Sequence, residues 1–442
     1  MTYVIASFGL QTAAARFLAL LNESETELWS AASAIFILTL VVTTIATIAF
    51  VVLSPTLSVY FTKTTEWTFA FILGAFWVFS GTLALVFQAF VQGLRRYKSI
   101  ATILLVSRLA LIGFTFFGLY FFDSVETPIL AWIIYNTIVV GWSLGITGKR
   151  ILNFRGKTEI RKILRYSIPL GFAAMVGVIA NTIDQFLVGG YLNALALGVY
   201  NAAVVMSGAL SLVLFTPLVT ALLPEFSARV DNESEIASGL RLAIRFVILA
   251  TLPSSFILAG VSGQALEIFA GNRVYLSGIT ALQILCLLFV IGSIQGIFTS
   301  LLQALGRTLL IMIIGLLSVL NVTVISVLLI PIYGITGAAL GNALLGVSGI
   351  GIPLIFTRKY VRGVGQFGFY SKVLVSSLLS FVTMSELANR ISSSPFTILP
   401  YTVIGTGIFL ILLRAFRTLN AEDKEHLKNF LPISLQRLIS LL

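Results

Sequence analysis

Thirteen long apolar runs constrain this 442-residue chain more than any other feature of its sequence. Each is about 20 residues or longer, enough for a helix to cross the roughly 30 Å hydrocarbon core of a bilayer. Only helices and closed barrels can span lipid, and barrel strands would alternate apolar and polar residues, which these runs do not. We therefore predict an all-α polytopic membrane protein. The runs lie near residues 2–21, 29–53, 67–93, 99–122, 127–148, 167–190, 195–224, 240–263, 278–302, 307–330, 335–356, 369–389 and 397–416.

The composition agrees with this class and excludes several functions. Apolar residues make up 58% of the chain and charged residues 10%, with a mean hydropathy of +1.03, outside the range of soluble globular proteins. The short connections leave no soluble domain for a separate active site, so we expect no enzyme. Cys286 and His426 are single residues of their types, which excludes disulfide frameworks and Cys/His metal sites within one chain. No GxxxxGK[ST] motif is present, so the chain is not a P-loop ATPase, and we expect no cofactor or metal.

The distribution of Lys and Arg predicts the orientation. One set of alternate loops holds sixteen of these cations, whereas the opposite set holds three, Lys63, Arg273 and Arg390. Because short cytoplasmic loops carry the excess of cations, we expect a multi-pass protein of the cell membrane with a cytoplasmic C-terminus. This bias accounts for most of the net charge of +11, so no nucleic-acid partner is needed.

Two internal matches predict that the chain contains parallel repeats. Asn-Glu-Ser-Glu at 22–25 recurs at 232–235, and FQAFVQGLRR at 87–96 resembles FTSLLQALGR at 298–307. These offsets of 210 and 211 residues leave the run at 167–190 without a counterpart, so we expect the first N-lobe helix to be missing, through a truncated or a diverged amino end. The predicted plan is an incomplete N-lobe (1–148), a basic cytoplasmic linker (149–166), a six-helix C-lobe (167–357), two additional transmembrane helices (358–417) and a cytoplasmic amphipathic tail (418–442).

Three stretches carry a resemblance to a known family. Residues 167–206, with Pro169 near the start, Asp184 late in the first run and LGVYN opening the next, resemble the start of the C-lobe in polysaccharide flippases. SFGLQTAAARFLA (7–19) is similar to the end of their second helix, and FVQGLRRYKSIA (90–101) to the turn between their fourth and fifth. These translocases of O-antigen and related lipid-linked oligosaccharides are a branch of the multidrug/oligosaccharidyl-lipid/polysaccharide exporter superfamily.

The resemblance implies fourteen helices and alternating access between two lobes. The implied substrate is a polyprenyl diphosphate-linked glycan, flipped from the cytoplasmic to the outer leaflet of the lipid bilayer. A glycan polymerase or ligase of the same pathway is an implied further partner. A multidrug or other small-molecule exporter of the same superfamily is the alternative, although such exporters usually stop at twelve helices and two runs here follow residue 358.

Cations inside the apolar runs are candidates for binding the diphosphate, Arg above all because its planar fork pairs with phosphate oxygens. Arg108 lies about nine residues into its run, where a charge costs ~2.5–3.5 kcal/mol on insertion scales. We predict that Arg108 lines the cleft, with a structural role in the helix bundle as the alternative. Arg16, Arg245 and Lys372 lie nearer the interface, where long side chains can also snorkel to water.

Asp184 is the candidate for ion coupling. It lies in ANTIDQFLVGG (180–190), within an otherwise apolar run, with Asn181 on the same helical face and Gln185 next to it. We predict that Asn181, Gln185 and Asn201 help to bind the glycan. Asp184 either exchanges a proton or sodium ion during transport or packs its helix against a neighbour near Asn201, and the sequence leaves both roles open.

Overall fold

The computed structural model describes residues 6–20, 25–94, 96–122, 124–148, 151, 160–216, 222, 226, 229, 232–361, 367–390 and 397–419. Helices dominate this part of the chain, which contains no strand, and the predicted fold class is confirmed. The main helices are α2 (Leu10–Leu20), α3 (Glu25–Thr62), α4 (Thr68–Gly93), α5 (Tyr97–Phe122), α6 (Glu126–Thr147), α7 (Ile160–Tyr191), α8 (Ala194–Leu210), α10 (Glu233–Gly260), α11 (Ser262–Ala270), α12 (Ile279–Ala304), α13 (Thr308–Tyr333), α14 (Ile335–Val361), α15 (Phe367–Arg390) and α16 (Ile398–Ala415). A π-helical turn, η2 (Ser211–Phe215), follows α8, and a 3₁₀ helix, η3 (Arg273–Gly278), precedes α12.

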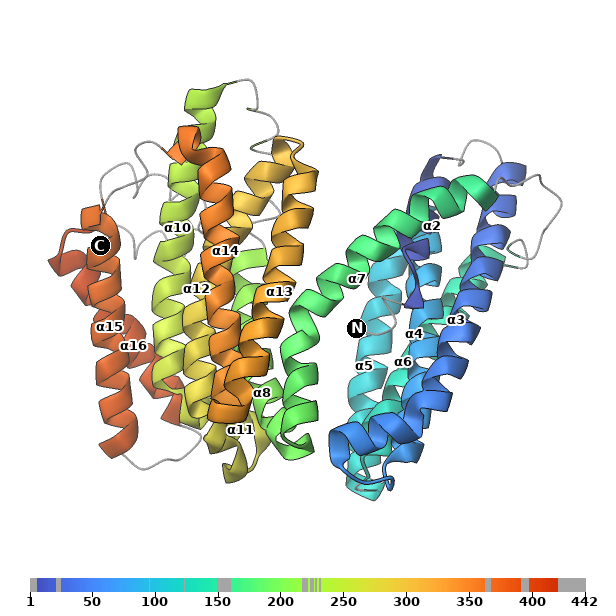
Figure 1. The fold of residues 1–442 in the computed structure, drawn as a ribbon, viewed down its shortest axis with the longest axis horizontal. Coiled ribbons are helices and arrows are strands. Elements are labelled where there is room, and N and C mark those ends of the chain that lie inside the picture. Colours follow the sequence, from blue (N-terminus) through green and yellow to red (C-terminus); the bar gives the residue numbers. More distant parts are fainter. Residues whose placement is uncertain are drawn as a thin grey trace. The chain divides into compact units, whose positions relative to one another are not determined.

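Ten helices in the described residues are long and apolar enough to cross a membrane. The chain divides into two compact units, residues 1–181 and 182–442, with the boundary inside α7. Figure 1 shows the helices of each unit. Residues 420–442 of the predicted amphipathic tail (418–442) lie outside the described residues, as do residues 149, 150 and 152–159 of the predicted linker.

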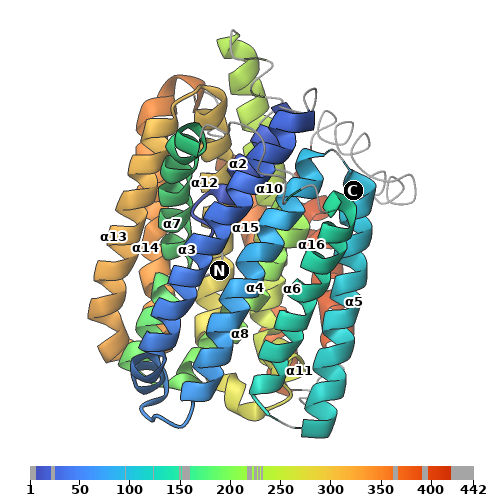
Figure 2. The same cartoon turned by 90° about the vertical axis from the view of Figure 1, so that its right-hand side faces the viewer.

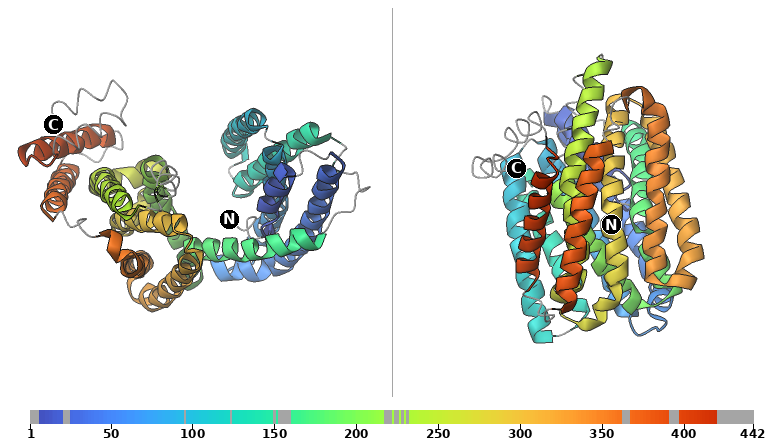
Figure 3. Two further views of the ribbon diagram at one scale, coloured as in Figure 1. Left: turned by 90° about the horizontal axis from the view of Figure 1, so that it is seen from above. Right: turned by 90° about the vertical axis from the view of Figure 1, so that its left-hand side faces the viewer.

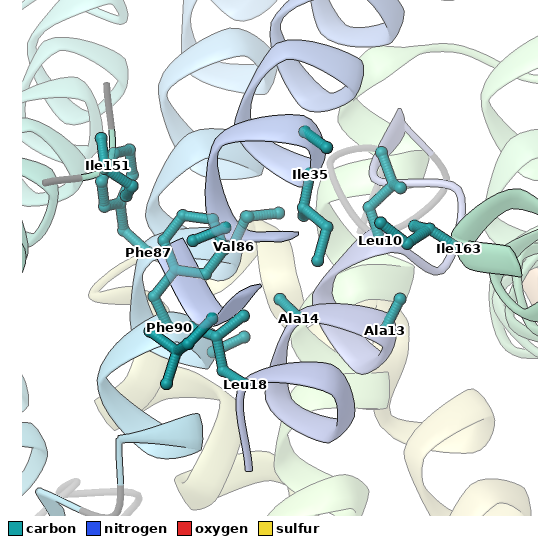
Figure 4. Packing of buried hydrophobic residues seen from close by; sticks show 14 of the residues in the cluster. Leu10, Ala13, Ala14, Leu18, Ile35, Val86, Phe87, Phe90, Ile151 and Ile163 are labelled. Carbon is teal, nitrogen blue, oxygen red and sulfur yellow. The ribbon is translucent and has the colours of Figure 1, made fainter. Parts of the chain in front are cut away.

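In the first unit, α4 packs against α2, α3 and α6, and α6 also packs against α5 (Figure 2). The apolar faces of α2, α3 and α4 form its core. Leu10, Leu18, Ile35, Phe87 and Phe90 are almost fully buried and meet there (Figure 4). α4 therefore lies at the centre of this unit.

Two features of the first unit differ from uninterrupted helices over the predicted runs. The first run was predicted near residues 2–21; in the described residues a turn at 7–9 interrupts it between the helical Ala6 and the start of α2 at Leu10, and Phe8 and Gly9 in this turn have positive φ angles of 47° and 75°. α3 extends nine residues beyond its predicted end at 53, past Pro55, with Thr62 Oγ1 donating to the carbonyl of Ser58 at 2.7 Å. At 1.5 Å per residue this 38-residue helix is about 57 Å long, longer than the hydrocarbon core is thick.

The second unit is built around α12. This helix lies between α10 and α14 (Figure 1), with α13 packed on α14. α15 packs against α10, and α16 packs against α15 (Figure 3). α10 begins at Glu233, seven residues before the predicted start, because Asn232 caps it with a side-chain oxygen that accepts from the Ser234 and Glu235 amides. The Asn-Glu-Ser-Glu sequence at 232–235 is thus a helix start.

A GxxxG sequence, Gly337 to Gly341, lets α14 approach α13 closely. A Cβ added at Gly337 would lie 2.9 Å from the backbone nitrogen of Ile330 and closer still to the carbonyl of Leu329. A Cβ at Gly341 would lie 3.3 Å from the backbone nitrogen of Ser326 and closer to its hydroxyl. The two helices are therefore in backbone contact just before Asn342.

We predict that Gly337→Ala destabilises the protein by about 1–3 kcal/mol, because the added methyl group meets rigid backbone of α13. Gly351→Ala is the matched control in the same helix, since its Cβ would meet no atom within 4 Å. It should be neutral, or stabilising by up to about 1 kcal/mol through helix propensity. Thermal unfolding of both variants in micelles measures the difference, and equal stability would contradict the close contact.

Candidate functional site

A buried polar cluster joins three helices of the second unit. Asp184 of α7 is 4% exposed, and its Oδ2 accepts hydrogen bonds from Tyr200 of α8 at 2.7 Å and from the Asn342 amide of α14 at 2.6 Å. The same Asn342 amide donates to the Tyr200 hydroxyl at 3.1 Å. The carboxyl group therefore has two neutral donors on one oxygen.

Local structure places each member of this cluster. Asn193 caps the start of α8 by accepting from the Ala196 amide at 2.8 Å, which positions Tyr200 in the second turn. Tyr200 is fully buried and packs in an apolar cluster with Val188, Leu266 and Leu282. The GxxxG contact with α13 precedes Asn342 directly. Buried polar groups of this kind are stable only when they are bonded to each other, as these three are.

The other residues predicted near Asp184 take different positions. Asn181 is exposed, and its amide donates to the carbonyl of Gly177 in its own helix at 2.7 Å. Gln185 is partly exposed and Asn201 is exposed. The hydrogen-bond partner of Asp184 on α8 is Tyr200, the residue before Asn201. Roles for Asn181, Gln185 and Asn201 in binding remain predictions.

Arg108 of α5 is exposed and lies beside two aromatic rings of α6 in the first unit. Its guanidinium carbon is 5.2 Å from the ring centroid of Trp132 and 5.0 Å from that of Tyr135. Trp132 in turn contacts Trp77 of α4, with ring centroids 5.6 Å apart. The attraction between a guanidinium group and aromatic faces holds the side chain in this position. In the described part of the chain, no hydrogen bond or ion pair engages the Arg108 guanidinium.

The remaining candidate cations differ in accessibility. Arg245 of α10 is 7% exposed, and its guanidinium carbon lies 4.2 Å from the ring centroid of Phe369 of α15. This geometry favours a packing role between the two helices. Lys372 of α15 is exposed. Arg16 lies in α2, but its side chain is outside the described residues.

Sequence reasoning missed the partners at both sites. Tyr200 lies in the LGVYN stretch, but nothing there marks its hydroxyl as buried. Asn342 is a polar residue inside the small-residue stretch TGAALGNALLG (336–346), and such intramembrane amides are a signal for interhelical bonds. Trp132 and Tyr135 have the i, i+3 spacing that places two rings on one helical face. None of these signals identifies the partner helix.

Comparison with known proteins gives the family. The model of the family described as "Polysaccharide biosynthesis protein" matches residues 1–277. The chain is similar to the solved structure "Lipid II flippase MurJ, inward closed conformation", with a TM-score of 0.75 and 17% identity over 94% of this chain and 92% of that chain. It is also similar to an inward-facing multidrug resistance MATE family transporter of the MOP superfamily, with a TM-score of 0.67 and 13% identity over 82% of this chain and 89% of that chain.

A MOP superfamily transporter from Pyrococcus furiosus is more distant, with a TM-score of 0.51 and 15% identity over 82% of this chain and 85% of that chain. Comparison with curated proteins gives no match. At these identities the structural likeness establishes the fold, whereas the family model covers more than half of the sequence. The chain therefore belongs to the polysaccharide biosynthesis protein family and has the fold of the multidrug/oligosaccharidyl-lipid/polysaccharide exporter superfamily.

Proposed function

We propose that this protein flips a lipid-linked oligosaccharide from the cytoplasmic to the outer leaflet by alternating access between its two lobes. The observation that carries the proposal is the family match over residues 1–277 in a chain with a MurJ-like fold. A glycan on a polyprenyl diphosphate has a polar head that cannot cross hydrocarbon unaided, so its transfer needs a polar path through a helical protein. Polysaccharide biosynthesis, from which the family takes its description, requires such a transfer when the glycan is assembled on a lipid at the cytoplasmic face.

Arg108 is the residue we propose for binding the diphosphate. The rings of Trp132 and Tyr135 hold the guanidinium, while its in-plane N–H groups are not used by any hydrogen bond or ion pair in the described residues. Those donors can pair bidentately with phosphate oxygens. The aromatic contacts and the anion site are therefore compatible, because they use different parts of the guanidinium group.

A small-molecule exporter is the second candidate, and the MATE-like fold favours it. The aligned share of this chain falls from 94% for the flippase structure to 82% for the MATE structures. α15 and α16 follow the six predicted helices of the C-lobe. Exporters of this superfamily usually have twelve helices and lack such an additional pair. We therefore rank the exporter below the flippase.

Deleting the gene tests the function directly. We expect the lipid-linked glycan to accumulate with its sugar on the cytoplasmic face, where a lectin that cannot cross the membrane binds it in inside-out vesicles. Restoring the gene should return the signal to its normal level. A normal glycan distribution together with increased sensitivity to small toxic compounds would contradict the flippase and favour the exporter.

Substitution of Arg108 tests the diphosphate site. Arg108→Lys should keep partial transport, because it retains the cation but loses the bidentate fork, whereas Arg108→Ala should abolish transport without lowering the amount of folded protein. Arg414→Ala is the matched control, since Arg414 is also exposed but lies in the last turn of α16. Surface-glycan complementation and membrane protein levels are measured in parallel. Full transport by Arg108→Ala would remove Arg108 from the site.

Two substitutions separate ion coupling from packing at Asp184. Asp184→Asn keeps the size and a hydrogen-bond acceptor but cannot exchange a proton, so loss of transport with normal protein levels is the expected result. Tyr200→Phe removes one donor but keeps the acid, and should retain transport. Tyr191→Phe, at the exposed end of α7, controls for the loss of a hydroxyl. Full transport by Asp184→Asn, or equal loss by Asp184→Asn and Tyr200→Phe, would leave Asp184 as a packing residue.

A further inference from the structure

The second unit contains a polar cavity of about 300 Å³, separate from the Asp184 cluster. It is lined by the end of α10, by α11, by η3, by the start of α12 and by the last turns of α15. The sequence prediction treated residues 264–277 as a connection between two runs. In the structure this connection forms α11 and η3, and these two short helices build much of the cavity wall.

Specific backbone features form this wall. Gly260 lets α10 approach α15, since a Cβ there would lie 2.8 Å from Cβ of Met384. Gly271 ends α11 with a φ of 65°, and Asn272 caps η3 by accepting from the Val274 amide at 3.0 Å. The residues that line the cavity are thus held by helices with defined ends rather than by an irregular loop.

Gln264 is the most informative lining residue. Its side chain is 6% exposed, and in the described part of the chain its amide makes no hydrogen bond. Gln283 lines the same cavity and donates to the carbonyl of Ala259 at 3.3 Å and to the hydroxyl of Ser262 at 3.4 Å. Because Gln264 lines the cavity and its amide has no protein partner in the described residues, its N–H and C=O groups are available to water or to a ligand there.

The charges in the cavity are balanced. Arg273 and Glu267 form an ion pair, with Nε and Oε1 3.5 Å apart. This pairing disfavours the binding of a free anion, because the Glu267 carboxylate would repel it. It also disfavours a free cation, because the Arg273 guanidinium would repel it. The remaining polar lining consists of neutral amides and hydroxyls, which donate to and accept from hydroxyl groups equally well. Leu276 and Ile279 add an apolar side.

We propose that this cavity binds one neutral pyranose ring of a glycan. A volume of about 300 Å³ is large enough to hold a single sugar ring. The amides and the free lone pairs of Glu267 match the ring hydroxyls, and the apolar side matches the C–H face. The identity of the ligand as part of the transported glycan rests on the proposed function. Arg273 belongs to the cation-poor loops, so the predicted orientation places this site on the outer face, where the glycan is released.

Protection of an introduced thiol tests this site. Ser385 lines the cavity and is partly exposed, whereas the natural Cys286 is fully buried, so Ser385→Cys provides a reactive thiol in the cavity. The protein is purified in a detergent without a sugar head group, because a maltoside would compete. Methyl glucoside and methyl N-acetylglucosaminide are the probes. At twice the Kd they should slow maleimide labelling about threefold by mass action. Thr65→Cys, at an exposed turn of the first unit, should show no change.

Variants identify the groups responsible. Gln264→Met in the Ser385→Cys background keeps the side-chain length but loses the amide, and should abolish protection. Glu267→Gln provides a second variant if thermal unfolding shows that Gln264→Met is misfolded. Gln303→Met, at an exposed position of α12, is the matched control and should retain protection. Unchanged labelling with both glycosides, or protection that survives Gln264→Met and Glu267→Gln, would overturn the proposal.

Two further measurements distinguish a sugar from an anionic lipid as the ligand, and distinguish failure of the sugar site from failure of the flippase proposal. Prenyl diphosphate without sugar should give no protection, and protection by it but not by the glycosides would show that the cavity binds an anion or a lipid. The thiol assay needs no transport, so Asp184→Asn should keep full protection. If gene deletion has no effect on the lipid-linked glycan while glycosides still protect the thiol, the flippase proposal is contradicted and the sugar-site proposal is still supported.

Discussion

A backbone amide without an internal hydrogen bond costs several kcal/mol in hydrocarbon, and the whole structure follows from this cost. The described residues therefore form helices, with turns confined to their ends. Hydroxyl side chains follow the same rule. Thr39, Thr47 and Thr251 each donate to the carbonyl four residues earlier, at 2.7–2.8 Å. A hydroxyl in an apolar run thus completes its own helix and does not by itself indicate a site.

Polar groups that bond across helices are more informative, because they must find a partner during assembly. Asn136 of α6 donates to the hydroxyl of Ser80 of α4 at 3.2 Å in the first unit. Asp184, Tyr200 and Asn342 connect three helices in the second unit. In lipid, apolar packing has little solvent-driven preference for one helix arrangement over another, so these bonds help to fix the rotation of each helix. The Asp184 cluster is therefore both a structural joint and the place where a change of ionisation would act on three helices at once.

Much of the fold could be predicted from hydropathy, because ten of the thirteen apolar runs correspond to described helices that are long and apolar enough to cross a membrane. The helix ends could not, since the turn at Phe8 and Gly9 and the continuation past Pro55 depend on local backbone geometry. Asp184 was recognisable as an acid in an apolar run, yet Asn342 is 158 residues away and its pairing depends on how α14 packs on α13. Likewise, hydropathy indicated residues 264–277 only as a gap between helices, and the cavity they form follows from their capping and packing.

Among the candidate site residues, Arg108 offers an accessible cation, whereas the acid Asp184 is buried. Arg108 is exposed, and its N–H donors make no hydrogen bond or ion pair in the described residues. Four acids in the described residues of the second unit already have partners: Asp184 accepts from two donors, and Glu233, Glu235 and Glu267 each pair with a basic side chain. A cationic drug would need an accessible acid, and binding it at any of these four would first require breaking an existing interaction. A diphosphate could bind Arg108 without displacing a hydrogen-bond or ion-pair partner in the described residues, which supports the proposed lipid-linked substrate.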